Sequence, residues 1–144
     1  MELKDLITDS YRHLGSSRNL EKVRFSLDAD HSQAVAPVDQ GQMEQVFANL
    51  FANAVDAMGG AGDLRVAIRS SEQSVVITVS DSGSGVPQES IEKIFEPFYT
   101  TKDKGTGLGL AIVYNIIKKH NGDITIESEA GKGTTFTITL PTRR

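Results

Sequence analysis

Asp81-Ser-Gly-Ser-Gly85 and, further along the chain, Gly105-Thr-Gly-Leu-Gly109 are the two most informative segments of this sequence. The first stretch places a carboxylate and two glycines directly after an apolar run at residues 75–79, which is typical of a β-strand. A carboxylate on a tight turn at a strand end can accept a hydrogen bond from an exocyclic amine. The second stretch opens a segment with helical spacing, and a glycine turn at a helix N-terminus presents N–H groups and the positive end of the dipole to an anion. One site for an amine and one for phosphates suggest a purine nucleotide, and ATP is our working hypothesis.

The apolar spacing on both sides of these stretches predicts an α+β protein. Helical spacing occurs at 3–14, 39–58, 88–94 and 107–120, and extended or alternating spacing at 23–27, 34–38, 64–68, 75–79, 124–126 and 136–140. Helices and strands segregate instead of alternating regularly. This favours a two-layer α/β sandwich, in which three helices cover one face of a mixed, mostly antiparallel sheet. No internal repeat or boundary divides residues 1–144, so we expect a single domain.

Residues that favour caps and turns mark the ends of these elements. Asp39 can cap the long helix, and Gly59-Gly60 can end it. The polar residues 70–73 predict a hairpin between two strands, and Gly131-Lys-Gly133 predicts a second one. Asn121-Gly122 stops the last helix.

Composition excludes several classes of site. The chain has 144 residues, of which 38% are hydrophobic and 24% charged, with no cysteine and a net charge of −4. A disulfide framework and a thiolate zinc site are therefore impossible. The negative charge argues against binding to nucleic acid or to an acidic membrane surface. No apolar run approaches the roughly 20 residues of a membrane span, and the N-terminus is not a signal peptide. We expect a cytoplasmic domain.

Asn49 and Asn53 stand four residues apart on the predicted long helix, so their side chains share one face. A buried asparagine in a helix is unfavourable unless its amide is used. An amide oxygen is an adequate ligand for Mg²⁺, whose other ligands are waters and phosphates. The alternative is that both are exposed polar positions or bond to a loop.

The glycine motifs have other interpretations. Asp81 and its glycines could form a turn with an Asx hydrogen bond alone. Gly105-Thr-Gly-Leu-Gly109 lacks the dinucleotide fingerprint, because Leu110 stands where a glycine is required, and it could be a hinge. Gly131-Lys-Gly-Thr-Thr135 is not a P-loop, because residue 126 is Ile.

The three histidines form no recognisable catalytic or metal set. They are His13, His31 and His120. None has metal-ligand spacing with another, and we expect all three at the surface. His120 would end a helix, where a cation is favourable.

Five motifs in order resemble the successive boxes of the catalytic and ATP-binding domain of sensor histidine kinases. They are Asn49-Leu-Phe-Ala-Asn53-Ala54, Asp81-Ser-Gly-Ser-Gly85, Phe95-Glu-Pro-Phe98, Gly105-Thr-Gly-Leu-Gly-Leu110 and Gly131-Lys-Gly-Thr-Thr-Phe136. They cover residues 40–140, and the run Phe95-Glu-Pro-Phe-Tyr-Thr-Thr-Lys102 is most similar to sensor kinases of the nitrogen-regulation type. The resemblance implies the Bergerat fold, a mixed sheet under three helices.

The resemblance also implies roles at the adenine end of a site. Asp81 would accept a hydrogen bond from the adenine amino group. Gly83 and Gly85 would let the backbone approach the ring, and Thr134 or Thr135 would support the Asp81 end of the pocket.

At the phosphate end, the resemblance implies that Asn53 ligates Mg²⁺ and that Asn49 lies beside the phosphates. Residues 96–106 would form a lid over the nucleotide, with Lys102 as a phosphate contact. Asn49, Asn53 and Lys102 would be the catalytic residues. Further nucleotide-binding residues would be Phe95, Thr101, Gly105, Thr106, Gly107, Leu108 and Gly109, with Phe98 as a second anchor of the lid.

A kinase of this family transfers the γ-phosphoryl group of Mg-ATP to a histidine on a separate dimeric helical hairpin, and a response regulator is its downstream partner. The hairpin is not recognisable in this sequence. We therefore expect residues 1–15 to form a helix that follows a missing hairpin, and we expect little transfer by the chain alone. The full-length protein could be anchored in a membrane.

Three alternatives use the same fold. Gyrase-type ATPases carry a Glu four residues before the metal-binding Asn to activate water, but this position is Asn49, which cannot act as a general base. A Ser/Thr kinase of the anti-sigma type shares the motifs. A non-catalytic binding or interaction module that has lost its nucleotide is the third alternative.

Overall fold

The computed structural model describes residues 3–16, 18–29, 38–86, 109–129 and 131–142. Its helices are α1 (Leu3–Leu14), α2 (Gln40–Ala57) and α4 (Gly109–Lys119). Its strands are β1 (Lys22–Ala29), β2 (Ala61–Ser70), β3 (Ser74–Asp81), β4 (Asp123–Glu129) and β5 (Gly133–Pro141). Among the described residues, no helix is long and apolar enough to cross a membrane.

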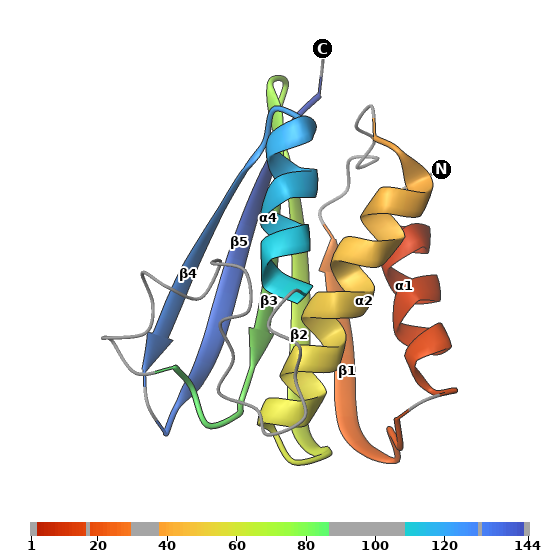
Figure 1. Ribbon diagram of the computed structural model, residues 1–144, viewed down its shortest axis with the longest axis vertical. Helices are drawn as coiled ribbons and strands as arrows, with labels where there is room; N and C mark the ends of the chain where they lie inside the picture. Colours follow the sequence, from red (N-terminus) through yellow and green to blue (C-terminus); the bar gives the residue numbers. More distant parts are fainter. Residues whose placement is uncertain (1–2, 17, 30–37, 87–108, 130, 143–144) are drawn as a thin grey trace.

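The strands form one sheet in the order β1-β2-β3-β5-β4. β1 runs parallel to β2, and every other neighbouring pair is antiparallel. Figure 1 shows α1, α2 and α4 together on one face of this sheet. The predicted α+β sandwich, with three helices over a mixed, mostly antiparallel sheet, is therefore confirmed.

Helix α2 forms because an apolar stripe repeats at helical spacing and a cap begins it. Asp39 is the N-cap, and its Oδ1 accepts a hydrogen bond from Gln42 N at 2.8 Å, as the sequence predicts. Met58 is the C-cap and is followed by Gly59. The buried residues of α2 are those of the predicted stripe: Met43, Val46, Phe47, Leu50, Phe51, Ala54 and Val55. The apolar stripe thus packs α2 against the sheet and against its neighbours α1 and α4.

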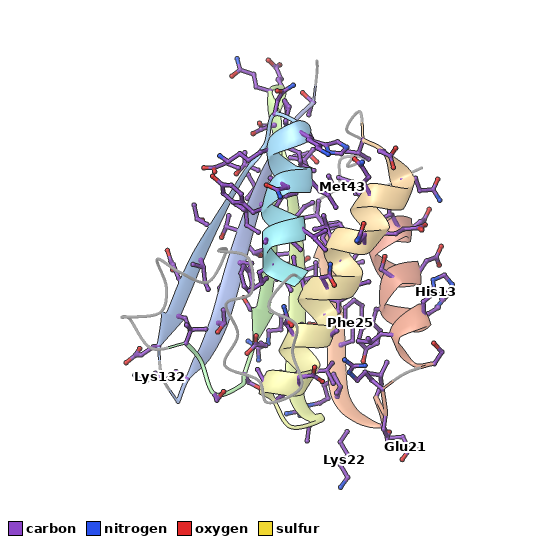
Figure 2. The ribbon with its side chains drawn as sticks, in the orientation of Figure 1. His13, Glu21, Lys22, Phe25, Met43 and Lys132 are labelled. Carbon is purple, nitrogen blue, oxygen red and sulfur yellow. The ribbon has the colours of Figure 1, made fainter. Side chains whose placement is uncertain are left out.

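Aromatic rings join α1, α2 and the edge strand β1. The Tyr11 ring stacks on Phe25 with centroids 4.0 Å apart, and Phe51 meets both rings edge-on at 6.1 and 5.8 Å. Figure 2 shows Phe25 in the space between α2 and α1, whereas His13 points away from α1. Offset and edge-on aromatic pairs add stability beyond their buried area. α1 is therefore an integral part of the core.

The strand register brings two predicted site residues together. Leu64 pairs with Asp81 at the end of the β2–β3 hairpin, and Asp81 pairs on its other side with Thr134 of β5. Inward residues alternate with outward ones along β2, β3 and β5. Asp81 therefore ends a central strand, with a neighbouring strand on both sides.

His120 differs from the surface histidine expected. Its Nε2 lies 2.9 Å from Asp39 N, and its Nδ1 lies 2.8 Å from Ile116 O. A backbone N–H only donates and a carbonyl only accepts, so Nδ1 carries the hydrogen and Nε2 accepts. His120 thus bridges the end of α4 and the start of α2, because the fold brings these two ends together.

Several expectations lie outside the described residues. These are the extended piece at 34–37, the short helix at 88–94, the lid at 96–106, His31 and the first two residues of the helix predicted at 107–120.

Candidate functional site

Asp81 is held at the end of β3 by its own turn. Its Oδ1 accepts a hydrogen bond from Gly83 N at 2.8 Å, which is the Asx geometry considered as an alternative to ligand binding. Burial raises the pKa of Asp81 above its ordinary value, although hydrogen bonds from the backbone of Gly83 and Thr134 act in the opposite direction. A carboxylate has about four lone-pair sites, so the turn orients Asp81 and leaves acceptor capacity for a ligand.

The loop after Asp81 packs on the end of α2. A Cβ at Gly83 would lie 2.8 Å from both the carbonyl carbon and oxygen of Ala57, so no side chain fits at this position. Ser84 N donates to the same carbonyl at 3.2 Å. The glycine is therefore required for contact between the loop and α2, which carries Asn49 and Asn53.

The β4–β5 turn holds the other side of this loop. Gly131 N donates to Ser84 O at 2.7 Å, and Val86 N donates to Ser128 Oγ at 2.6 Å. Gly133 has φ of 120°, and a Cβ there would overlap the Asp81 carbonyl oxygen. Figures 1 and 2 show the turn, marked by Lys132, at the same end of the sheet as the loop after β3 and the end of α2.

Asn49 and Asn53 are both half-buried on α2, neither fully exposed nor in the core. A Cβ at Gly109 would lie 3.6 Å from Asn49 Oδ1, so the Asn49 amide lies beside the first residue of α4. Ala57 lies two further turns along α2, about 12 Å of helix rise beyond Asn49. One helix therefore connects the start of α4 to the Asp81 loop, with Asn53 between them.

The two threonines lie on opposite faces of β5. Thr134 is buried opposite Asp81, and its Oγ1 lies 2.9 Å from Ser128 Oγ. Thr135 lies opposite Ser80, and their hydroxyl oxygens are 2.9 Å apart. Of the two candidates, the geometry favours Thr134 as the support for Asp81.

The predicted site residues that the structure describes thus lie in two groups that α2 connects, one at the start of α4 and one at the end of β3. They are Asn49, Asn53, Asp81, Gly83, Gly85, Gly109 and Thr134. The remaining predicted site residues lie outside the described part of the chain: Phe95, Phe98, Thr101, Lys102, Gly105, Thr106, Gly107 and Leu108.

Sequence reasoning missed Ser128. Ile124, Ile126 and Ser128 share one face of β4, and the serine interrupts an otherwise apolar alternation. A polar residue at an inward position of a strand was the available signal, because such a group needs a partner.

Comparison with known proteins identifies the family. Residues 38–144 match the family described as histidine kinase-, DNA gyrase B- and HSP90-like ATPase. The chain belongs to this family. The ATPase domain is also similar to the catalytic domain of the histidine kinase ThkA in a nucleotide-free form, with a TM-score of 0.88 and 33% identity over 99% of this chain and 96% of that one. The resemblance to sensor histidine kinase catalytic domains is therefore confirmed.

Curated relatives of the ATPase domain are longer proteins. Sporulation kinase E of Bacillus subtilis is 40% identical over 96% of this chain and 19% of its own length. Sensor histidine kinase ZraS of Escherichia coli is 38% identical over 98% of this chain and 30% of its own length. The chain thus spans less than a third of these relatives.

Proposed function

We propose that this domain binds Mg-ATP and donates the γ-phosphoryl group to a histidine on a separate dimerisation hairpin, as the kinase core of a two-component sensor. The observation that carries the proposal is the continuous scaffold from Asn49, beside the start of α4, to Ala57, against the Asp81 loop. A scaffold of this kind suits an elongated ligand with an amine at one end and phosphates at the other.

Asp81 would recognise the base. Its carboxylate is already oriented by Gly83, so it can accept the adenine amino group with little reorganisation. Asp81 is half-buried, and a ligand that donates a hydrogen bond to its charged form would offset the cost of its desolvation. Thr134 would support Asp81 from the neighbouring strand.

Asn53 would hold the magnesium ion through its amide oxygen, with Asn49 beside the phosphates. Among the described residues, no group of three or more His, Cys, Asp or Glu could hold a metal. One amide ligand nevertheless fits Mg²⁺, which keeps several waters and takes phosphate oxygens as its other ligands. When bound, the ion would neutralise charge on the transferred phosphoryl group. Lys102 and the glycines at 105–109 would add further phosphate contacts.

Asn49 would also suppress hydrolysis. An amide cannot remove a proton from water, so no general base stands at this position of α2. Phosphoryl transfer to a histidine depends on positioning and charge neutralisation more than on such a base.

The partners follow from the same proposal. A structure of ThkA in complex with the response regulator TrrA is similar to this chain, with 30% identity and a TM-score of 0.83. We expect a response regulator as the downstream partner here, and a cytoplasmic location, where ATP is supplied.

The direct test is a calorimetric titration of the chain with a nonhydrolysable ATP analogue, with and without Mg²⁺. We expect saturable one-to-one binding that the metal strengthens. Absence of binding in both conditions would overturn the proposal. Incubation with γ-labelled ATP and histidine hairpins of candidate kinases then tests transfer, and steady phosphate release well above background would instead indicate a hydrolase.

A further inference from the structure

The geometry assigns a positioning role to Ser128, a residue outside the predicted nucleotide contacts. We propose that its hydroxyl fixes the loop at residues 81–86 for nucleotide binding. This inference rests on the proposed function, because the loop begins with the residue expected to recognise adenine.

The Ser128 hydroxyl lies at the centre of three contacts. Its Oγ is 2.6 Å from Val86 N, 3.1 Å from Gly133 O and 2.9 Å from Thr134 Oγ1. The Val86 N–H can only donate and the Gly133 carbonyl can only accept. A hydroxyl has one donor and two acceptor sites, so Ser128 satisfies all three contacts when the Thr134 hydroxyl donates to it.

These contacts join both ends of the loop to β5. Val86 is at the far end of the loop, and Thr134 is the strand partner of Asp81 at its start. One side-chain oxygen of Ser128 therefore connects Val86, at the end of the loop, to Thr134, which pairs with Asp81 at its start. Loss of this oxygen would leave the Val86 N–H and the Gly133 carbonyl without this partner.

The other contacts of the loop amides show why Ser128 is the informative position. Ser82 N donates to Asp63 O, Ser84 N donates to Ala57 O, and Gly83 N donates to Asp81 itself. Two of these acceptors are backbone carbonyls, which no substitution removes, and the third is the predicted ligand of adenine. Ser128, in contrast, is a side-chain acceptor outside the predicted nucleotide contacts. One substitution therefore removes this hydrogen bond and leaves the predicted nucleotide contacts in place.

The test compares Ser128→Ala with Ser80→Ala as a matched control. Ser80 also forms a hydroxyl–hydroxyl contact, at 2.9 Å with Thr135, and lies next to Asp81 in the sequence. Its partner Thr135 follows Thr134 in β5, so it points to the other face of the sheet. Both variants delete one hydroxyl from a half-buried serine of the same sheet.

We expect Ser128→Ala to raise the Kd for a nonhydrolysable ATP analogue by up to roughly 10-fold, because loss of one hydrogen bond lowers the fraction of molecules whose loop is arranged for binding. Hydrogen exchange at the Val86 amide should accelerate in the same variant. Ser80→Ala should change neither quantity, even if it lowers the unfolding midpoint equally. Ser128→Thr retains Oγ and a side chain that suits a strand, and should restore wild-type affinity.

Equal affinity of Ser128→Ala and wild type would refute the inference, as would an equal loss in Ser80→Ala. If Ser128→Ala does not fold, Ser128→Cys replaces it, since sulfur is a weak acceptor of similar shape, and the same affinity loss is expected. These results are distinct from failure of the proposed function, in which wild type itself would not bind the analogue.

Discussion

Replacement of Asp81 by asparagine removes the charge of the predicted adenine acceptor and leaves its shape. The new amide oxygen can still accept from Gly83 N, which lies 2.8 Å from Oδ1 in the native protein, so the turn should persist. Binding should lose a charge-assisted hydrogen bond, which costs about 1–3 kcal/mol. The Kd for a nonhydrolysable ATP analogue should therefore rise roughly 5- to 150-fold in a calorimetric titration.

The same substitution should not destabilise the protein without nucleotide. Burial raises the pKa of Asp81, which means that the charged carboxylate is disfavoured in the folded state. Its removal should leave the free energy of unfolding at neutral pH unchanged or increased, as measured by urea denaturation. Asp63→Asn is the control. It also removes a negative charge near the loop, but this charge pairs with Arg24 and Arg65 and has no predicted contact with the nucleotide.

The pH dependence of stability and of nucleotide affinity provides a second test of Asp81. Since the folded pKa of Asp81 is raised, the folded state binds more protons than the unfolded state between the ordinary and the raised value. The Asp81 contribution to stability should therefore increase as pH falls through this interval, while nucleotide affinity decreases. Both trends should disappear in Asp81→Asn. An unchanged affinity in this variant at neutral pH would refute the assignment of Asp81 to adenine.

Three further substitutions, one of them paired with a control, test other parts of the structure. Asn53→Ala should weaken binding of the ATP analogue more in Mg²⁺ than in chelator, and equal losses in the two titrations would move the metal elsewhere. Gly133→Ala should lower the free energy of unfolding by about 2–4 kcal/mol in urea, because a Cβ meets the Asp81 carbonyl at positive φ. Gly131→Ala, also at positive φ but in open space, should cost only about 1 kcal/mol, so equal costs would contradict this reason. Phe51→Ala should cost about 3–5 kcal/mol in the same assay, and a loss below about 1 kcal/mol would show that the aromatic cluster does not support the core.

The elements were predictable from the sequence because their signals are local. The seven apolar residues of α2 repeat at helical spacing, and all seven are buried because this face meets the sheet and the neighbouring helices. The cap at Asp39 and the hairpin at 70–73 depend on a few neighbouring residues and are confirmed. The order of the motifs identified the family.

The remaining features depend on how distant segments meet. The choice between Thr134 and Thr135 requires the register of β5 against β3, because a shift of one residue exchanges the two faces. The bridge at His120 exists because the end of α4 meets the start of α2. Ser128 gains its role from a loop that precedes it by about forty residues in the sequence, and no local pattern specifies that approach. The roles of Lys102 and of the lid stay predictions.

The position of β5 between β3 and β4 affects the order in which this domain can form during synthesis. A ribosome makes β3 and its Asp81 well before β5, which later supplies the strand between β3 and β4. Until β5 emerges, the nascent chain has β4 without a neighbour in the sheet and Asp81 without Thr134 beside it. On the proposed role of Asp81, a growing chain should be unable to hold nucleotide until translation has passed β5. Release or stalling before this strand would then yield a product that cannot compete for ATP.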